Sequence, residues 1–479
     1  MAASLDYEDV VAPLLHRTGV ALLLLLPLTN VRSQTTAAIN QGSTNAVAEK
    51  SWRETLEDRG IAFSVESDTD VFVNVSGGIK QDAVVFNWLK LGLNLDMYSL
   101  TGWAPFHDTN IHAEAHYPAG TDISKYVGDL AGVSNNAAYN SFRLYELWMQ
   151  KEFKAGPVVA SLKAGLLSAD QEFDLINVAS LFINSSFGAD LGFGGTVPIP
   201  IYPFNAPGAR LQLSIGDERS LKATLRSALF DGNSAAPKLG FAIDAPTEPS
   251  FNKYGVDPHL NPNAGLIFIN ELELDFLKPE PQANPTRATG HWLFVPGRFL
   301  VGGFYTTDRF ADVYEAQLEE LGVATASHRA REISGNYGNY LVWEQKFYEG
   351  TPGIDNGLYG FARGSVLPED RNFVSVTTEA GLVYKGVFRC EKDTLDSFGV
   401  GFGYSGISNN VEHANRVARQ EGVPGASNLT YEGVLEATYS VPINSHWAVQ
   451  PDLQWVIQPG GSDHFHDAVV LGVRSTVTF

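Results

Sequence analysis

The last eleven residues of the chain show an alternation of side-chain character with a period of two. Successive side chains of a β-strand point to opposite faces, so a period of two predicts a strand with two different surfaces. One face suits lipid and the other suits water. Counted back by twos from the C-terminus, the apolar series is Phe479, Val477, Ser475, Val473, Leu471 and Val469, and the polar series is Thr478, Thr476, Arg474, Gly472 and Val470.

The same alternation recurs along the chain. It is clearest at residues 145–151, 158–167, 209–215, 221–229 and 447–457. In the first of these, Tyr145, Leu147 and Met149 form the apolar series, and the chargeable groups collect in the opposite series. The predicted wet faces supply donors and acceptors at Lys163, Arg210, Lys222, Arg226 and Arg474, and at Glu146, Glu271, Glu273, Glu432 and Glu436.

Residues 20–28 form an apolar run that is preceded by His16-Arg17 and followed by Val31-Arg32-Ser33. This order is typical of a secretory signal peptide, and the run is about half of the ~20 residues that span a bilayer. We expect residues 1–33 to be cleaved and residues 34–60 to form a mobile leader and a short N-terminal segment. After the signal peptide, helical periodicity is visible only at residues 52–60, and elsewhere period two dominates.

No further stretch resembles a transmembrane helix. Hydrocarbon leaves backbone groups unsatisfied except in helices and closed barrels. The alternating strands therefore predict an all-β fold, a closed antiparallel transmembrane β-barrel over residues 61–479. The length allows about 16 strands of ~10 residues, joined by short periplasmic turns and long extracellular loops. Polar segments at 231–262 and 409–428 are expected to be such loops.

Several functional classes find little support in the sequence. The net charge of −21 argues against nucleic acid as a partner, and the single cysteine, Cys390, excludes an internal disulfide. His112, Glu114 and His116 could share one face of a strand, but further zinc ligands are missing nearby, so neither a metal nor a cofactor is expected. No Gly-x-Ser-x-Gly elbow is found, and the chain is not expected to be an enzyme.

A set of short motifs resembles the carbohydrate-selective porins of the OprB type. The motifs follow one another from about residue 96 to the C-terminus, in the order of that family. They are Arg143-Leu-Tyr-Glu-Leu-Trp148 with Gln150, Ser161-Leu-Lys-Ala-Gly-Leu166, Ala169-Asp-Gln-Glu-Phe173, and the segments 181–188, 202–208, 230–232, 368–372, 450–454 and 459–461.

The resemblance implies a barrel of about sixteen strands that passes sugars by passive diffusion through the outer membrane of a Gram-negative bacterium. Its partners would be mono- or oligosaccharides, outer-membrane lipid and lipopolysaccharide. The C-terminal strand with Phe479 would be read by the barrel-assembly machinery. Two alternatives remain open from the residues themselves: a porin for other small solutes such as anions, and a soluble β-rich surface binding protein.

The candidate pore-lining and sugar-binding residues are those whose parity places them on wet faces. Trp148, flanked by Glu146 and Gln150, could stack on a pyranose, or it could belong to an interfacial girdle if the strand phase shifts by one. Arg143 has the opposite parity to Glu146 and lines the lumen only if a bulge or strand start intervenes. Residues 173–208 could fold inward to narrow the pore or form an ordinary extracellular loop. The full set is Arg143, Glu146, Trp148, Gln150, Lys163, Arg210, Lys222, Arg226 and Arg474.

Overall fold

The structure is a computed structural model that describes most of residues 51–479. Residues 1–33 of the predicted signal peptide, most of the predicted leader and Cys390 lie outside the described residues. The described ranges are 51–216, 221–232, 252–260, 265–276, 291–292, 297–323, 329–351, 354–389 and 394–479.

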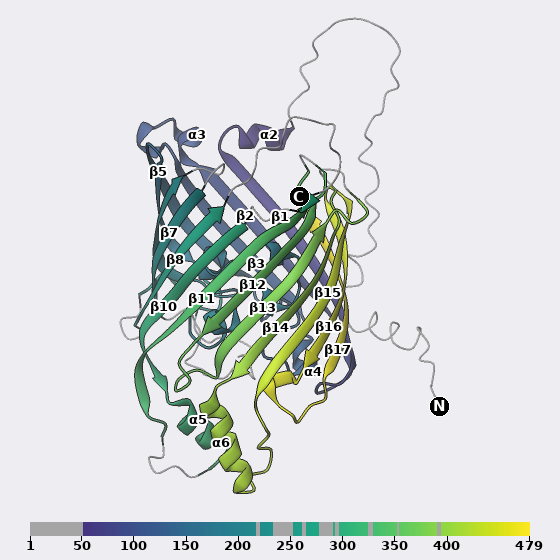
Figure 1. Cartoon of the computed structure of the whole chain (residues 1–479). Coiled ribbons are helices and arrows are strands. Elements are labelled where there is room, and N and C mark those ends of the chain that lie inside the picture. Colours follow the sequence, from purple (N-terminus) through teal and green to yellow (C-terminus); the bar gives the residue numbers. More distant parts are fainter. Residues whose placement is uncertain are drawn as a thin grey trace, which may run out of the picture. The chain divides into compact units, whose positions relative to one another are not determined.

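Antiparallel strands close into a barrel, as the alternation predicted (Figure 1). Strand β17 pairs with β1, which also pairs with β2, so the long strands form a ring of sixteen. The two-residue strand β9 (His291–Trp292) adds only to one end of β11. The long strands of the first half are β1 Ile61–Ser76, β2 Asp82–Asp96, β3 Thr109–Gly120, β4 Arg143–Ala155, β5 Val158–Leu167, β6 Ala206–Gly216, β7 Leu221–Asp231 and β8 Leu266–Phe276. Those of the second half are β10 Gly297–Ala311, β11 Glu332–Glu349, β12 Gly357–Val366, β13 Val374–Lys385, β14 Ser397–Ile407, β15 Tyr431–Asn444, β16 Trp447–Ile457 and β17 Ala468–Thr478.

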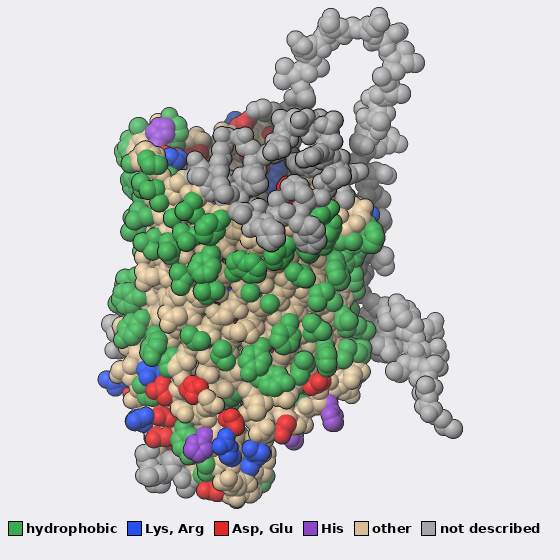
Figure 2. Space-filling view, viewed as in Figure 1, with side chains coloured by type: hydrophobic (Ala, Val, Ile, Leu, Met, Phe, Trp, Pro, Cys, Tyr) green, Lys and Arg blue, Asp and Glu red, His purple; other side chains and the backbone are tan. Residues whose placement is uncertain are grey.

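The outer wall carries the apolar series that the sequence predicted. Leu147, Leu211 and Leu453 are exposed there, while Glu146, Arg210 and Asp452 of the same strands are buried inside the barrel. Figure 2 shows the hydrophobic side chains spread over the barrel wall, with charged groups gathered beyond the strand ends near α5 and α6. No helix among the described residues is long and apolar enough to cross a membrane.

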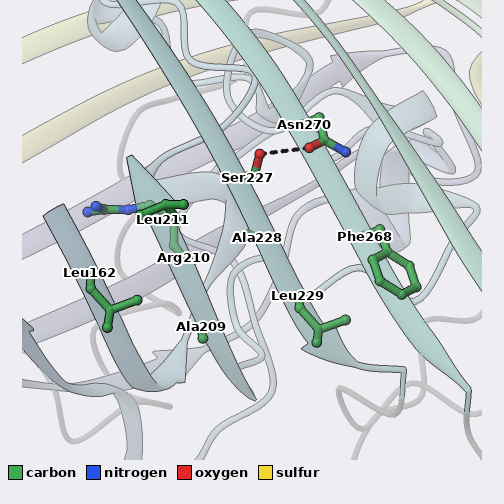
Figure 3. A pocket seen from close by; sticks show the side chains of 9 residues that line it. All are labelled: Leu162, Ala209, Arg210, Leu211, Ser227, Ala228, Leu229, Phe268 and Asn270. Atoms are coloured by element: carbon green, nitrogen blue, oxygen red, sulfur yellow. Dashed lines mark hydrogen bonds between the residues drawn. The ribbon is translucent and has the colours of Figure 1, made fainter. Parts of the chain in front are cut away.

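A shallow groove on this outer wall crosses β5 to β8 (Figure 3). Leu162, Leu211 and Leu229 line it. Ser227 and Asn270 also line it, and Ser227 Oγ donates a hydrogen bond of 2.8 Å to Asn270 Oδ1. The parity of these residues is that of the lipid-facing series. The groove is therefore a feature of the barrel exterior and not part of a path through the lumen.

Strand β4 contains a β-bulge, which is the condition under which Arg143 was expected to face the lumen. Glu114 of β3 pairs with Glu146, but its neighbour Ala115 pairs with Leu144, which leaves Tyr145 as an extra residue. The bulge corrects one expectation: Tyr145 belongs to the lumen and not to the apolar outer series. Its hydroxyl donates to Asp170 Oδ1 at 2.7 Å. Arg143 is buried on the same inner side.

Helices occupy the connections. The expected helix at residues 52–60 is α2 (Trp52–Glu57), which begins with a capping box between Ser51 and Glu54. The prediction that helical periodicity is confined to that region was wrong, because α5 (Val313–Glu320) and α6 (Asn409–Gln420) also form. The short elements are α3 Met97–Thr101, α4 Ser124–Val127, η1 Ala104–Phe106, η2 Ala169–Gln171, η3 Val178–Leu181, η4 Ser185–Phe187, η5 Leu191–Gly195 and η6 Pro459–Gly461.

Helix α6 replaces the polar loop expected at 409–428. Ser408 caps its N-terminus by accepting a hydrogen bond from Asn410 N. Val411, Ala414 and Ala418 lie on one buried face, and the last two pack with Leu318 of α5. The apolar face is narrow and surrounded by Asn, Arg and Glu, so the helical pattern was hidden in a segment of polar composition.

The connections at the two ends of the barrel agree in part with the predicted short periplasmic turns and long extracellular loops. Connections of two residues, 156–157 and 445–446, lie at the barrel end that carries the C-terminus, and the long connections 121–142 and 168–205 lie at the opposite end. By the usual polarity of such barrels, these ends are periplasmic and extracellular, respectively. The connection 97–108 is an exception, since it lies at the periplasmic end and holds α3 and η1.

Candidate pore and solute path

The connection 168–205 folds into the barrel and not away from it. Its apolar side chains Phe173, Phe182, Ile183 and Phe187 are buried and pack with inner-wall residues such as Phe361 in one core. The burial decides between the two alternatives left open for residues 173–208, because a plain extracellular loop would expose these side chains. The lumen therefore contains a packed apolar layer as well as water-facing strands.

Charged groups of the inner wall bind the backbone of this inward loop. Arg363 on β12 donates to the carbonyl oxygens of Ser186 at 2.7 Å and Gly188 at 2.8 Å. Glu436 on β15 accepts from the amides of Ile183 and Asn184 at 2.7 and 2.9 Å. The buried loop thus satisfies its polar backbone groups with side chains of the wall. Further contacts of this kind join Glu344 to Val178 N, Glu271 to Asp174 N, and Arg298 to Leu175 O.

The connection 121–142 is held in a similar way by side chains of β1, β15 and β17. Arg474 of β17 forms two hydrogen bonds with Asp70 of β1, at 2.7 and 2.8 Å, and also donates to Ser134 Oγ at 3.0 Å. Glu432 accepts from Leu130 N at 2.8 Å. Arg474 is therefore a loop-anchoring group in this geometry and lies apart from the other basic candidates.

The inner wall from β4 to β11 carries a series of paired charges, and three of them, Glu271, Arg298 and Glu344, also bind the inward loop. Glu172 of the inward loop forms ion pairs with Lys163 and Arg210. Arg210 also donates to Gln150 Oε1 at 3.0 Å. Next along the wall, Arg226 donates to Gln212 Oε1 at 3.3 Å. The series continues through Arg226 with Glu271 at 2.9 Å and Glu273 at 2.5 Å, and through Arg298 with Glu273 at 3.1 Å and Glu344 at 2.7 Å.

We call this series the polar track. It contains four cations and four carboxylates, so its charges compensate one another along the wall. Its most exposed side chains are Arg226 at 17% and Glu172 at 13%, and the other members are nearly or fully buried. The track therefore combines hydrogen-bond donors and acceptors without a large net charge.

The pKa of Glu172, which lies on the inward loop, reflects its surroundings. Burial opposes ionisation of the carboxyl, but Lys163 and Arg210 outweigh this effect and lower its pKa. A lowered pKa means that the ion pairs persist at neutral pH and are lost only in acid. The anchorage of the loop to the track at Glu172 is thus ionic under physiological conditions.

Trp148 stands on the inner face of β4, at one end of the polar track. Its indole N–H donates to Glu146 Oε2 at 2.8 Å. The His112 ring stacks on the indole at 4.9 Å, and Lys163 Nζ lies 3.9 Å from the ring centroid. Gly165, directly across on β5, makes room for this arrangement, because a Cβ atom there would lie 2.7 Å from Trp148 Cα.

Arg143 and Lys222 differ from the other candidates in position. Arg143 lies at the extracellular end of β4, only 1% exposed, with its guanidinium 5.4 Å from the Tyr139 ring and 5.2 Å from the Phe204 ring. Lys222 is half-buried on the inner face of β7, opposite Asp275 of β8. The structure thus places Arg143 beneath the loops, and Lys222 beyond Arg226 toward the periplasmic end.

The fold brings together most of the predicted set. Glu146, Trp148, Gln150, Lys163, Arg210 and Arg226 share one stretch of inner wall, whereas Arg143 and Arg474 lie elsewhere. Sequence reasoning missed Glu172 as a member, since a loop residue has no strand parity to reveal it. It also missed Arg298, Glu344 and Arg363, although alternation within residues 297–311, 332–349 and 357–366 could have indicated their faces.

The His112-Ala-Glu-Ala-His116 segment forms hydrogen bonds within the inner wall. Glu114 accepts from His116 Nε2 at 2.8 Å and lies 3.5 Å from Lys90 Nζ. Within the described part of the chain, no group of three or more His, Cys, Asp or Glu residues is arranged to hold a metal ion. The lysine supplies positive charge at the place where a cation would bind.

Three comparisons place the chain among known proteins. Residues 80–479 match the family model described as "Carbohydrate-selective porin, OprB family". The chain is 26% identical over 446 residues to Porin B of Pseudomonas aeruginosa, with 89% of each protein covered. Among solved structures, it is similar to the high-pH structure of Pseudomonas putida OprB, with a TM-score of 0.72, 21% identity, and coverage of 89% of this chain and 96% of that chain.

Proposed function

Because the chain belongs to the OprB family of carbohydrate-selective porins, we propose that small sugars cross the barrel by exchanging hydrogen bonds along the polar track. The protein is a channel of the Gram-negative outer membrane that passes carbohydrates by diffusion. The proposal assigns the selectivity to Gln150, Lys163, Arg210 and Arg226, with Glu172 of the inward loop.

The pairing of every cation in the track with a carboxylate is the observation that carries the proposal. Unpaired pore cations would attract anions and select by charge. Compensated pairs instead offer many donors and acceptors that can replace water around hydroxyl groups. This chemistry suits neutral solutes with many hydroxyls, and it disfavours the alternative of an anion porin through the basic strands.

Sugar block of ion current in planar bilayers tests the proposal. Gln150→Leu removes a hydrogen-bonding group that bridges to Arg210 without changing charge. We expect glucose or maltose block to weaken by about 0.5–1.5 kcal/mol, the usual net contribution of one hydrogen bond, with unchanged ion selectivity. Gln420→Leu, at the end of α6 outside the barrel, is the matched control. Equal block in the two variants would contradict a role for the track.

A further inference from the structure

Lys151 lies on the lipid-facing side of β4. The same series contains Leu147, Met149 and Phe153, which are 43%, 51% and 52% exposed. Its cross-strand neighbour on β5 is Leu162, also exposed on the outer wall at 49%. An ammonium group in this position faces hydrocarbon or the membrane interface, where charges are rare unless they find polar partners.

The connection between β2 and β3 supplies those partners. Lys151 Nζ donates to the carbonyl oxygens of Pro105 at 2.6 Å and His107 at 3.1 Å, and to Thr109 Oγ1 at 3.2 Å. Residues 105–109 must therefore fold over the outside of the wall and not over the mouth of the lumen. A neighbouring ion pair of 2.9 Å joins Lys154 to Asp108 and fixes the end of the connection.

The connection exposes an apolar surface. Residues 97–106, named here the 97–106 segment, contain no Asp, Glu, Lys or Arg. Trp103 is 60% exposed and Leu100 39%. Trp103 packs edge-on against Phe106 at 5.0 Å, and Asp96 caps α3 through the amides of Tyr98 and Ser99. The corner labelled α3 in Figure 1 is covered by hydrophobic side chains in Figure 2, in continuity with the outer belt.

We propose that the 97–106 segment is an interfacial membrane anchor that binds the phospholipids of the periplasmic leaflet. Its place at the periplasmic rim, its contact with the lipid-facing Lys151 and its continuity with the apolar belt point to lipid and not to a soluble partner. Trp and Tyr side chains favour the headgroup boundary, where one end of the ring is apolar and the other is hydrated. The anchor extends the bilayer contact of the barrel beyond the ends of β2 and β3.

Fluorescence quenching in liposomes tests the anchor. In the full-length chain with Cys390→Ser, Trp103→Cys carries an environment-sensitive NBD label, and the vesicles contain phosphatidylethanolamine and phosphatidylglycerol. We expect blue-shifted emission, strong quenching by lipids spin-labelled near the headgroup, and weak quenching by aqueous iodide. Val256→Cys, 62% exposed between β7 and β8 at the other end, is the aqueous control, and Leu147→Cys is the lipid control.

The possible outcomes distinguish whether lipid, water or protein covers the 97–106 segment. Iodide quenching at Trp103→Cys that is several-fold weaker than at Val256→Cys, together with lipid-borne quenching, supports the anchor. Iodide quenching equal to that at Val256→Cys would overturn it. Protection from both quenchers would overturn it too, because it would mean that protein, such as a second copy of this chain, covers the segment. If Trp103→Cys does not assemble, Leu100→Cys provides the same measurement from α3.

Discussion

Arg143 shows how a single extra residue changes the face of a side chain. Parity counted along β4 places it outside, yet the bulge at Tyr145 turns it into the barrel. There it contacts the rings of Tyr139 and Phe204. Strand parity is thus a reliable guide to single residues only between bulges.

At the same scale, Trp148 remains the predicted sugar platform, and its contacts sharpen the expectation. His112 and Lys163 both lie against its ring, so a pyranose would contact the indole only after Lys163 moves aside. We expect Trp148→Ala to weaken sugar block of ion current by about 1–3 kcal/mol, as for the loss of one aromatic stacking platform. Trp455→Ala, on the lipid-facing side of β16 and 43% exposed, is the control. Block that survives in Trp148→Ala would remove the platform from the pathway.

Arg226 is the residue whose replacement should change the ion selectivity of the channel. It pairs with Glu271 and Glu273, so Arg226→Ala leaves these carboxylates without this cation. The reversal potential in a salt gradient should shift toward cation preference, and Lys222→Ala should shift it in the same direction, because a pore charge acts on every ion that passes. Arg416→Ala, on the outside helix α6, should leave the potential unchanged. An unchanged potential in Arg226→Ala would place this pair outside the ion path.

At the scale of elements, the inward loop is the main departure from a simple tube. Strands β8, β10, β11, β12 and β15 each contribute a charged side chain that binds its backbone. The loop forms backbone hydrogen bonds of its own, such as Phe182 N to Ala179 O at 2.9 Å, and the wall side chains satisfy backbone groups that these turns leave without a partner. The loop therefore behaves as part of the wall and not as a flexible lid.

Arg363 is the group on which this anchorage should depend most. Its side chain is fully buried and pairs with Asp174 at 3.1 Å and Glu379 at 3.0 Å. Arg363→Met leaves these carboxylates buried without their cation, a change that costs about 3–5 kcal/mol. We expect a higher single-channel conductance and weaker sugar block as the loop loosens.

The control for this prediction is Arg371→Met, which removes an arginine paired with Asp370 at the extracellular end. If Arg363→Met fails to assemble, Arg363→Lys keeps the charge but loses the planar fork, and should raise conductance to a smaller extent. Conductance that stays at the parent value in both Arg363 variants would mean that the loop does not limit the pore.

At the scale of the whole molecule, the C-terminus completes the ring of strands. The Phe479 amide donates to Val65 O at 2.9 Å, and Val65 N donates to Phe479 O at 3.2 Å. The aromatic side chain remains 53% exposed on the outside, free for recognition during assembly. The predicted role of this terminus is therefore compatible with its place in the folded barrel.

We expect deletion of Phe479, or Phe479→Lys, to reduce the yield of assembled barrel in outer membranes several-fold. The readout is the heat-modifiable, folded form on gels of fractionated membranes. Phe398→Lys is the control, because Phe398 is an exposed aromatic residue at the same end of the barrel, on β14. A normal yield in this variant would show that the defect comes from the terminal residue and not from the loss of any lipid-facing ring. Normal yield after deletion of Phe479 would show that assembly does not depend on the terminal residue.

The sequence by itself determined the barrel, because the period-two pattern of lipid-facing and water-facing residues is a local property of each strand. It also placed Gln150, Lys163, Arg210 and Arg226 on the inner face. Only the tertiary structure decided which inner charges bind the loops. That assignment depends on contacts between residues far apart in the chain, such as Glu436 with Ile183 and Arg474 with Ser134, and strand periodicity carries no information about them.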